Sequence, residues 1–538
     1  MKTFEDKFKI AAILLVFMAL SCETTNLEQL NDPSSLTVDS ADPDLLLNNA
    51  QLQFVDAIAY NEANEDGINR RASELARMQH LFGAYTSPNT LSSTSIDRLW
   101  TRMYREALQD INVLIPIAQD RGLQGHIGVA KIIQAYALVT MVDTFGDIPF
   151  TDALQGNNNP NPSVDDGQFV YDAMFETLDE AIEALSAPDI LMPNDLFYNG
   201  DAEKWIKAAR TLKFKMYAQM RLIGNFNTEI NTLISQGLID SSSEDFQFQY
   251  STTASSTGES RHPNFALCYD ADGVDDYMNN YYMFLLKDDK GFNDPRLRYY
   301  FYRQVEAPPV GDELMCEGDP GFNFCYIGDF YWGRDHGDDD GVPADMLKRT
   351  AYGLYPVGGA FDADNFTSVT PSSGAGGAGI FPFMLSSYVK FLQAESALMA
   401  GTTGNPRTLF EEGVRASMSK VLNFYPGQVD PAFAATQADV DNYVDFVLAQ
   451  YDAAAGNEAK LDVIMKEYYI ALWGNGIEAW NNYRRTSYPS DIEPSVVVAG
   501  NFPRTFMYPA IVVNTNSSIS QKQVTERVFW DANPDVLE

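Results

Sequence analysis

The strongest constraint on the fold is a helical spacing of apolar residues in two long blocks that flank a block without it. Apolar residues recur at steps of three and four within residues 44–235 and within residues 381–485, the period of an amphipathic α-helix. Residues 236–380 are instead rich in Ser, Gly, Asp and Pro, with short aromatic runs. The pattern predicts a mostly α-helical protein with a large irregular insert.

Each helical block divides into segments of similar length that are joined by short turns. Helix pairs of this kind bury their apolar faces by stacking on neighbouring pairs. They resemble the hairpins of tetratricopeptide-type repeats, although a generic helical domain has the same pattern. We expect helices over residues 44–58, 67–85, 95–120, 124–145, 168–185, 201–223, 383–400, 407–423, 437–451 and 459–485.

The first residues have the parts of an export signal. Three Lys precede an apolar run over residues 10–20, which Ser21 and Cys22 follow. The run is too short to cross a bilayer, which needs about 20 apolar residues, and a basic start before it is typical of a signal peptide. A Cys directly after a small residue resembles a bacterial lipobox, with an ordinary cleaved signal as the alternative. We expect residues 1–21 to be the signal peptide and Cys22 to carry a lipid.

The net charge excludes one class of partner. The chain has 74 acidic and 37 basic side chains, a formal net charge of −37. Such a charge repels nucleic acids and anionic lipid head groups. Membrane contact is therefore expected through the lipid anchor alone, while neutral or cationic ligands and divalent cations are compatible with the charge.

Three cysteines follow Cys22, too few for a disulfide-built scaffold. Cys316 and Cys325 enclose a short, turn-rich segment, and we expect them to form a disulfide in an oxidising compartment. Cys268 would then be a buried free thiol.

Aromatic rings in the irregular block are candidates for a ligand site, because flat rings bind sugar faces or peptide side chains at little entropic cost. Their neighbours are Asn, Asp, Arg and Gly, which suits a wet pocket, but the alternative is that most of the rings belong to the core. The loop after the second predicted helix is a similar candidate. The selected ligand-binding residues are Tyr85, Asn89, Tyr281, Tyr282, Tyr331 and Trp332.

A cluster of acidic residues in the same block is a candidate metal site. Asp335, Asp338, Asp339 and Asp340 lie close together in the sequence, and oxygen ligands in a flexible loop favour Ca²⁺. The cluster does not match the calcium-loop template, so a solvated acidic loop is the alternative. A metal bound here is expected to be structural, and the sequence indicates no other cofactor.

The sequence lacks the common catalytic signatures. Its four His do not form H-E-x-x-H, and neither G-x-S-x-G nor the phosphate-binding loop motif occurs. Any chain so rich in acids permits carboxylate pairs of the kind used in glycoside hydrolysis, so their presence is no evidence for it. We expect a protein that is not an enzyme.

Several short strings, in order along nearly the whole chain, resemble the SusD/RagB family of outer-membrane nutrient-binding lipoproteins. Each string is weak alone, and the resemblance depends on their order and spacing. They are the lipobox with residues 22–37, DTFGDIPF at 143–150, DPRL at 294–297, the segment 383–401, EAWNNYRRTSYP at 478–489 and PRTFMYP at 503–509.

This resemblance implies a mostly helical fold with tetratricopeptide-like pairs and a variable region that carries the ligand site. It also implies a partner, a SusC-like TonB-dependent barrel of the outer membrane, over which the lipoprotein sits as a lid. The organisation expected on these grounds is a signal peptide (1–21), a tether (22–43), an N-terminal helical scaffold (44–235), an irregular ligand-binding region (236–380), a C-terminal helical scaffold (381–485) and an irregular C-terminal segment (486–538).

The predicted function is that of a lipid-anchored, surface-exposed protein of the outer membrane. It would bind an oligosaccharide or a peptide and deliver it to the barrel. Two other functions stay open: a secreted hydrolase of a glycan or peptide, which catalytic turnover would reveal, and a surface protein for adhesion or assembly, which would have neither a small-ligand pocket nor a barrel partner.

Overall fold

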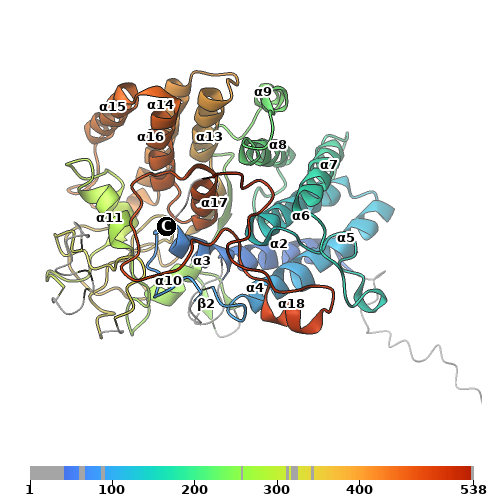
Figure 1. Cartoon of the computed structure of the whole chain (residues 1–538), viewed down its shortest axis with the longest axis horizontal. Coiled ribbons are helices and arrows are strands. Elements are labelled where there is room, and N and C mark those ends of the chain that lie inside the picture. Colours follow the sequence, from blue (N-terminus) through green and yellow to red (C-terminus); the bar gives the residue numbers. More distant parts are fainter. Residues whose placement is uncertain are drawn as a thin grey trace, which may run out of the picture. The chain divides into compact units, whose positions relative to one another are not determined.

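The computed structural model describes residues 41–59, 67–86, 91–255, 258–309, 314, 316, 325–340 and 344–534 (Figure 1). Residues 43–538 form one compact unit, and residues 1–42 form another, of which only the last two residues are described. The predicted signal peptide, Cys22 and most of the predicted tether therefore lie outside the described residues. The four predicted blocks that follow the tether are parts of a single compact unit.

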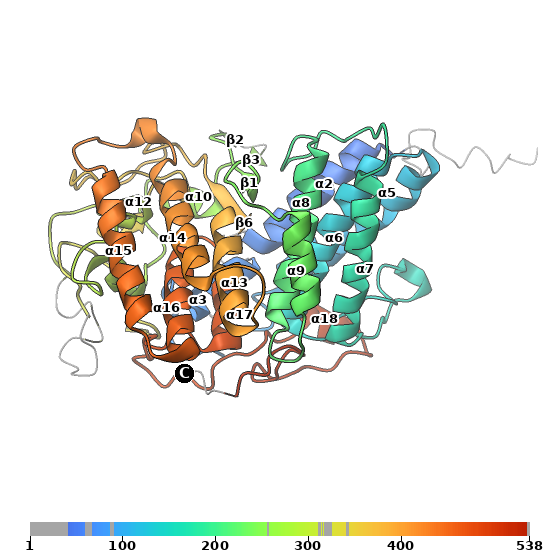
Figure 2. The ribbon, with the colours of Figure 1, turned by 90° about the horizontal axis from the view of Figure 1, so that it is seen from above.

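The N-terminal block is helical, as its apolar spacing predicted. Its helices are α2 (Pro43–Ala59), α3 (Ile68–Leu75), α4 (Asp97–Thr101), α5 (Gln109–Asp120), α6 (Gln124–Phe145), α7 (Gly167–Leu185), α8 (Ala202–Gln219) and α9 (Asn227–Gln236). Successive helices from α5 to α9 pack on one another, and α2 lies against α5 and α6 (Figure 2). A π-helical turn, Arg102–Leu108, joins α4 to α5, so the third predicted helix is one irregular rod.

The C-terminal block is built in the same way. Its helices are α13 (Ser386–Met399), α14 (Pro406–Leu422), α15 (Gln437–Ala453), α16 (Gly456–Ala471) and α17 (Gly476–Thr486). Helix α13 packs on α14 and α16, and α15 also packs on both α14 and α16. The mostly helical class is thereby confirmed, while the tetratricopeptide-type geometry of the pairs stays a prediction.

Between the blocks, regular structure is sparse, as expected for residues 236–380. The described strands form three two-stranded antiparallel sheets, β1 with β6, β2 with β3 and β4 with β5. The elements of this region are β1 (Phe246–Gln249), β2 (Ala254–Ser255), β3 (Gly258–Glu259), α10 (Pro263–Cys268), α11 (Asn280–Lys287), α12 (Leu297–Tyr300), β4 (Phe301–Tyr302), β5 (Ala351–Tyr352) and β6 (Ile380–Met384), and α18 (Ala510–Thr515) lies in the C-terminal segment.

Two predicted helices differ from the structure for local reasons. The helix expected over residues 67–85 ends at Leu75, because Arg77 takes a left-handed φ of 56° and buries its guanidinium. The helix expected over residues 459–485 is broken into α16 and α17. Asn475 begins the second helix as its N-cap, with its side chain accepting from the backbone N–H of Glu478.

Helix α6 is the described helix that is long and apolar enough to cross a membrane, and 89% of its apolar window is buried in the protein. A helix that is apolar on all sides is found in the core of a large protein as well as in a membrane. Its neighbours α5, α7 and α2 cover it, so it is the core helix of the N-terminal block.

The corner after α6 is fixed by one glycine and one aspartate. Gly146 ends the helix with a φ of +73°, a conformation that residues with a Cβ rarely adopt. The carboxylate of Asp147 accepts from the backbone N–H of Gly167, 3.0 Å away, which ties the corner to the start of α7.

Helix α17 lies at the centre of the fold, and every one of its residues is buried. Its Trp480 and Tyr483 belong to the core. Arg484 and Arg485 lie in the last turn, and both are buried and bonded to other elements. Arg485 forms a two-pronged ion pair with Glu395 of α13, in which Nη2 and Oε2 are 2.8 Å apart.

Helix α17 also approaches α3 closely. A Cβ placed on Gly476 would lie 2.4 Å from the backbone nitrogen of Ser73, so the first residue of α17 has no room for a side chain. The other Arg at the end of α17, Arg484, stacks on the Trp480 ring, with 3.5 Å between the guanidinium carbon and the ring centre. Helix α17 is therefore held in place by tertiary contacts in addition to its intrinsic helix propensity.

We expect Arg485→Met to lower the free energy of unfolding by about 3–5 kcal/mol, because it removes one partner of a buried ion pair. Glu395 would keep only Arg221, whose Nε is 2.6 Å from Oε1. Urea unfolding followed by circular dichroism measures the loss. Arg407→Met is the matched control, since Arg407 pairs with Asp452 in solvent. Equal losses in the two variants would contradict the role given to Arg485.

Candidate ligand-binding site

Three segments that are far apart in the sequence meet in the structure, and we call them together the loop platform. They are residues 80–86, 336–340 and 495–499. The first follows α3, the second belongs to the irregular block and the third belongs to the C-terminal segment. Two of them fall in regions where the sequence predicted ligand-binding or metal-binding residues.

Backbone hydrogen bonds join the three segments. Gly337 donates to the carbonyl of Leu81 at 3.0 Å, and the carbonyl of His336 accepts from Val496 at 2.9 Å. A Cβ on Gly337, whose φ is +83°, would lie 2.1 Å from the hydroxyl oxygen of Ser495. The second and third segments are thus packed too tightly for any residue but glycine at this position.

The outer side of the loop platform carries apolar and acidic side chains. Val498 is 95% exposed, and Phe82 is partly exposed. Thr86, Asp339 and Asp340, which belong to the same segments, are exposed as well. An apolar side chain in water next to hydrogen-bonding groups is the composition expected of a surface that holds a sugar or peptide.

Beneath this surface lies a layer of buried polar side chains. Arg77 donates to the Tyr85 hydroxyl at 3.1 Å, and His336 Nε2 lies 3.3 Å from the same hydroxyl. His80 Nε2 donates to the carbonyl of Asp338 at 2.7 Å. Burial lowers the pKa of His80 to about 3 and also lowers that of His336, so both imidazoles are neutral and act as fixed hydrogen-bonding groups.

Two buried carboxyls, Asp335 and Glu493, face each other in this layer. Asn280 donates to one oxygen of Asp335 at 3.2 Å, and the backbone of His336 donates to one oxygen of Glu493 at 3.3 Å. The second oxygen of each has no N–H donor among the described residues. Burial is the main cause that raises the pKa of Asp335 to about 7 and also raises the pKa of Glu493. We infer that one proton lies between the two carboxyls.

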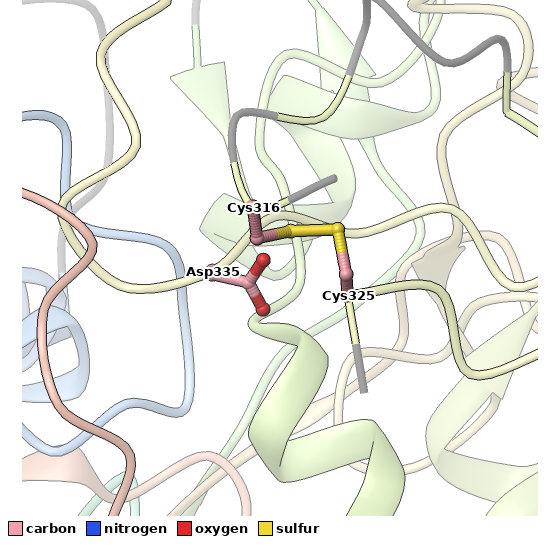
Figure 3. Close-up of side chains that lie close together, drawn as sticks. All are labelled: Cys316, Cys325 and Asp335. Atoms are coloured by element: carbon pink, nitrogen blue, oxygen red, sulfur yellow. A yellow bond between two sulfur atoms is a disulfide. The ribbon is translucent and has the colours of Figure 1, made fainter. Parts of the chain in front are cut away.

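The predicted metal ligands do not converge. Asp338 pairs with Arg334 at 3.2 Å, and Asp339 and Asp340 are exposed. Among the described residues, the group of potential ligands close enough to share an ion consists of Asp335 with two cysteine sulfurs that are bonded to each other (Figure 3). A structural Ca²⁺ at this acidic cluster stays a prediction, and the arrangement does not favour it.

The disulfide expected from the sequence is present. Cys316 and Cys325 are bonded, and Cys268 is a buried free thiol, as predicted. Burial raises the pKa of the Cys268 thiol well above its usual range, so the group stays protonated and is unreactive.

The rings selected as stacking residues lie in the core. Tyr281 and Tyr282, in α11, are 1% and 0% exposed, and the Tyr282 ring stacks on Trp473 at 5.0 Å between ring centres. Tyr331 lies under the Arg303 guanidinium. None of these rings offers a face to solvent, so their role in stacking on a ligand stays a prediction that the burial does not favour.

The remaining selected residues have three different outcomes. Trp332 is 3% exposed and donates from its indole nitrogen to the carbonyl of Ala307 at 2.7 Å, which is a packing role. Tyr85 supports the loop platform from below, and Asn89 lies outside the described residues. The exposed Phe82 and Val498 were not selected, because nothing in the sequence distinguishes them from core residues.

Two family models match the sequence. One, described as "Starch-binding associating with outer membrane", matches residues 33–313, and the other, "Susd and RagB outer membrane lipoprotein", matches residues 368–525. No curated protein matches the sequence.

Solved structures have the same fold over almost the whole chain. A chitin-binding protein is 20% identical with a TM-score of 0.64, covering 91% of this chain and 100% of that one. A chitin-binding SusD homolog from Flavobacterium johnsoniae is 19% identical with a TM-score of 0.65, covering 90% and 98%. A susd/ragb family protein from Bacteroides thetaiotaomicron is 18% identical with a TM-score of 0.67, covering 92% and 100%.

We expect the pair of carboxyls to make stability depend on pH. Because both pKa values are raised, the folded protein keeps protons that the unfolded chain releases above about pH 4. The free energy of unfolding therefore falls as the pH rises toward the folded pKa of about 7. Replacing both carboxyls, Asp335→Asn with Glu493→Gln, should reduce the fall in melting temperature between about pH 5 and 8.

Asp441→Asn is the control for that experiment. Hydrogen bonds from Arg415 lower the pKa of Asp441, so this carboxyl is ionised in the folded and unfolded chain over the whole range. Its replacement should leave the slope of melting temperature against pH unchanged. Identical slopes for the wild-type protein and the double variant would contradict the shared proton.

Proposed function

Because this chain belongs to the SusD/RagB family of outer-membrane lipoproteins, we propose that it binds an oligomeric nutrient at the cell surface. In this proposal it delivers the nutrient to a SusC-like TonB-dependent transporter. The export signal and Cys22 support the surface location, since a lipid at one end leaves the compact unit free to face the medium. The transporter partner comes from the family and is part of the proposal.

The observation that carries the proposal is the loop platform. Its exposed Phe82 and Val498 rest on a layer of neutral His and paired Arg side chains, so the binding surface is held in place before the ligand arrives. A preorganised surface loses little entropy on binding. An apolar patch flanked by Thr86 and Asp339 suits the C–H face and the hydroxyls of a sugar.

We favour an oligosaccharide over a peptide as the cargo. Two of the similar solved structures are named as chitin-binding, which makes N-acetylglucosamine oligomers the first ligands to test. A peptide ligand is the alternative outcome of the same screen.

The buried carboxyl pair is not placed for glycoside hydrolysis. Glycosidases hold their two carboxyls about 5 Å or about 6.5–9.5 Å apart, with the substrate between them. Asp335 and Glu493 are 0% and 1% exposed, so a substrate does not reach this pair. Incubation with N-acetylglucosamine oligomers and peptides should leave both intact, and turnover would show a hydrolase instead.

The proposed transporter partner separates this function from adhesion or assembly. Mild detergent extraction of the lipidated protein should bring a large barrel protein with it. Extraction of the protein alone, together with the absence of any small-ligand binding, would favour the adhesion or assembly role.

We expect Phe82→Ala combined with Val498→Ser to weaken the binding of an N-acetylglucosamine hexamer by about tenfold. The change removes the apolar face of the loop platform, and one ring contact contributes about 0.5–1.5 kcal/mol. Titration calorimetry on residues 23–538 measures the affinity. Leu191→Ser is the matched control, because Leu191 is 69% exposed and lies outside the loop platform. Equal affinity in the wild-type protein and the double variant would place the site elsewhere.

A further inference from the structure

A hollow is lined by residues of α2, strand β1, strand β3 and α10. Figure 2 labels these four elements on the ribbon. The volume of the hollow is about 620 Å³, and it shares no lining residue with the loop platform. Helix α2 forms one wall, and α10 with β3 forms the other, so the walls belong to elements of the N-terminal and irregular blocks. We call this hollow the α2–α10 cavity.

One part of the α2–α10 cavity is apolar. Phe248 and Tyr250 belong to β1 and to the residue that follows it, and their ring centres are 5.0 Å apart in an edge-to-face arrangement. Leu52 of α2 is 45% exposed at the rim, and Leu267 of α10 lines the opposite wall. These side chains give the cavity an apolar floor of the kind that holds a flat ligand face.

The charged side chains that line the cavity leave a negative excess. Arg261 is compensated, because its Nη2 and Nε lie 2.7 Å and 2.9 Å from the two carboxylate oxygens of Glu259. Asp270 accepts two backbone N–H groups and has no ion-pair partner among the described side chains. Asp56 is 3.9 Å from Arg102, and 40% of its side chain is exposed.

One buried polar group in the cavity is unsatisfied. Tyr250 is 9% exposed, and its hydroxyl has no hydrogen-bond partner in the part of the chain that the structure describes. Burial raises the pKa of Tyr250, and the charge of Asp56 raises it further, which places the hydroxyl within the field of that carboxylate. A buried hydroxyl without a partner is destabilising, so a bound group that reached it would stabilise the protein.

We propose that the α2–α10 cavity is a second ligand site, which binds a saccharide unit that carries a free ammonium group. The apolar floor receives the C–H face of the sugar ring, the carboxylates of Asp56 and Asp270 attract the ammonium, and the Tyr250 hydroxyl bonds a sugar hydroxyl. This site acts independently of the loop platform.

The lining favours an amino sugar over two other ligands. A neutral sugar would leave Asp270 without a counter-charge among the described side chains, and it would add none to Asp56, whose distance to Arg102 is 3.9 Å. A lysine side chain would supply the charge, but it has neither a flat ring face for Phe248 and Tyr250 nor hydroxyls for the Ser251 and Ser260 side chains, which lie at the same cavity.

The test uses residues 23–538, which keep the whole compact unit. A short glucosamine oligomer is titrated by calorimetry, with an N-acetylglucosamine oligomer of equal length and an oligolysine peptide as competing probes. Asp56→Asn should weaken the binding of the glucosamine oligomer by about tenfold or more, because it removes one counter-charge and keeps the side-chain shape. Raising the salt concentration should weaken binding by the wild-type protein more than binding by the variant.

Tyr250→Phe separates a role in binding from a role in folding. If the hydroxyl serves the ligand, the variant is at least as stable to heat as the wild-type protein but binds the glucosamine oligomer more weakly. The double variant of the loop platform, Phe82→Ala with Val498→Ser, should bind the glucosamine oligomer as the wild-type protein does. This result distinguishes failure of the cavity from failure of the loop platform.

Four results would overturn the proposal. They are no binding of the glucosamine oligomer, unchanged binding in both Asp56→Asn and Tyr250→Phe, equal binding of the N-acetylated oligomer with the same sensitivity to Asp56→Asn, and tighter binding of oligolysine than of the glucosamine oligomer.

Discussion

The fold depends on the pairing of buried charges on helix α17. A charge removed from water is tolerated only where it is paired and hydrogen-bonded, and the two arginines at the end of α17 find their partners on distant parts of the chain. Arg485 binds Glu395 of α13, and Arg484 donates to backbone carbonyls of Asp143 in α6 and of Arg504 in the C-terminal segment. Helix α17 therefore joins both helical blocks and the C-terminal segment.

The loop platform is a consequence of this anchoring. The chain leaves α17 at Ser487, whose φ is +60°, and returns to the helix at Arg504. It first runs along α16, where the backbone of Ser490 donates to Asp462 and Lys466 pairs with Asp491. It then supplies Glu493 to the buried carboxyl pair and residues 495–499 to the surface. Arg77 donates to the carbonyl of Glu493 at 3.2 Å. The buried layer that supports residues 80–86 therefore also supports residues 495–499.

The sequence predicted the scaffold well but not which distant segments meet at the candidate site, for one physical reason. Helix spacing is a local property, so α6 begins and ends at the predicted residues 124 and 145. The loop platform is formed by contacts between distant segments, which no local pattern encodes. The local sequence around a Tyr does not show whether its ring faces water or packs in the core. The Tyr282 ring stacks inside the core. The early end of α3 likewise depends on one left-handed residue, Arg77, whose partners lie elsewhere.

The net charge of −37 says little about the cargo, because the acidic side chains differ in their surroundings. Many are neutralised where they lie, as Asp294 is by Arg296, with 2.7 Å between the charged atoms in a fully buried pair. Others are compensated by a proton, as the pair containing Asp335 is. Charges separated by more than about 8 Å are screened at physiological salt, so a ligand responds only to carboxylates beside it. In the proposed function, selection of the cargo therefore depends on the few exposed carboxylates of each surface, and these differ between the loop platform and the α2–α10 cavity.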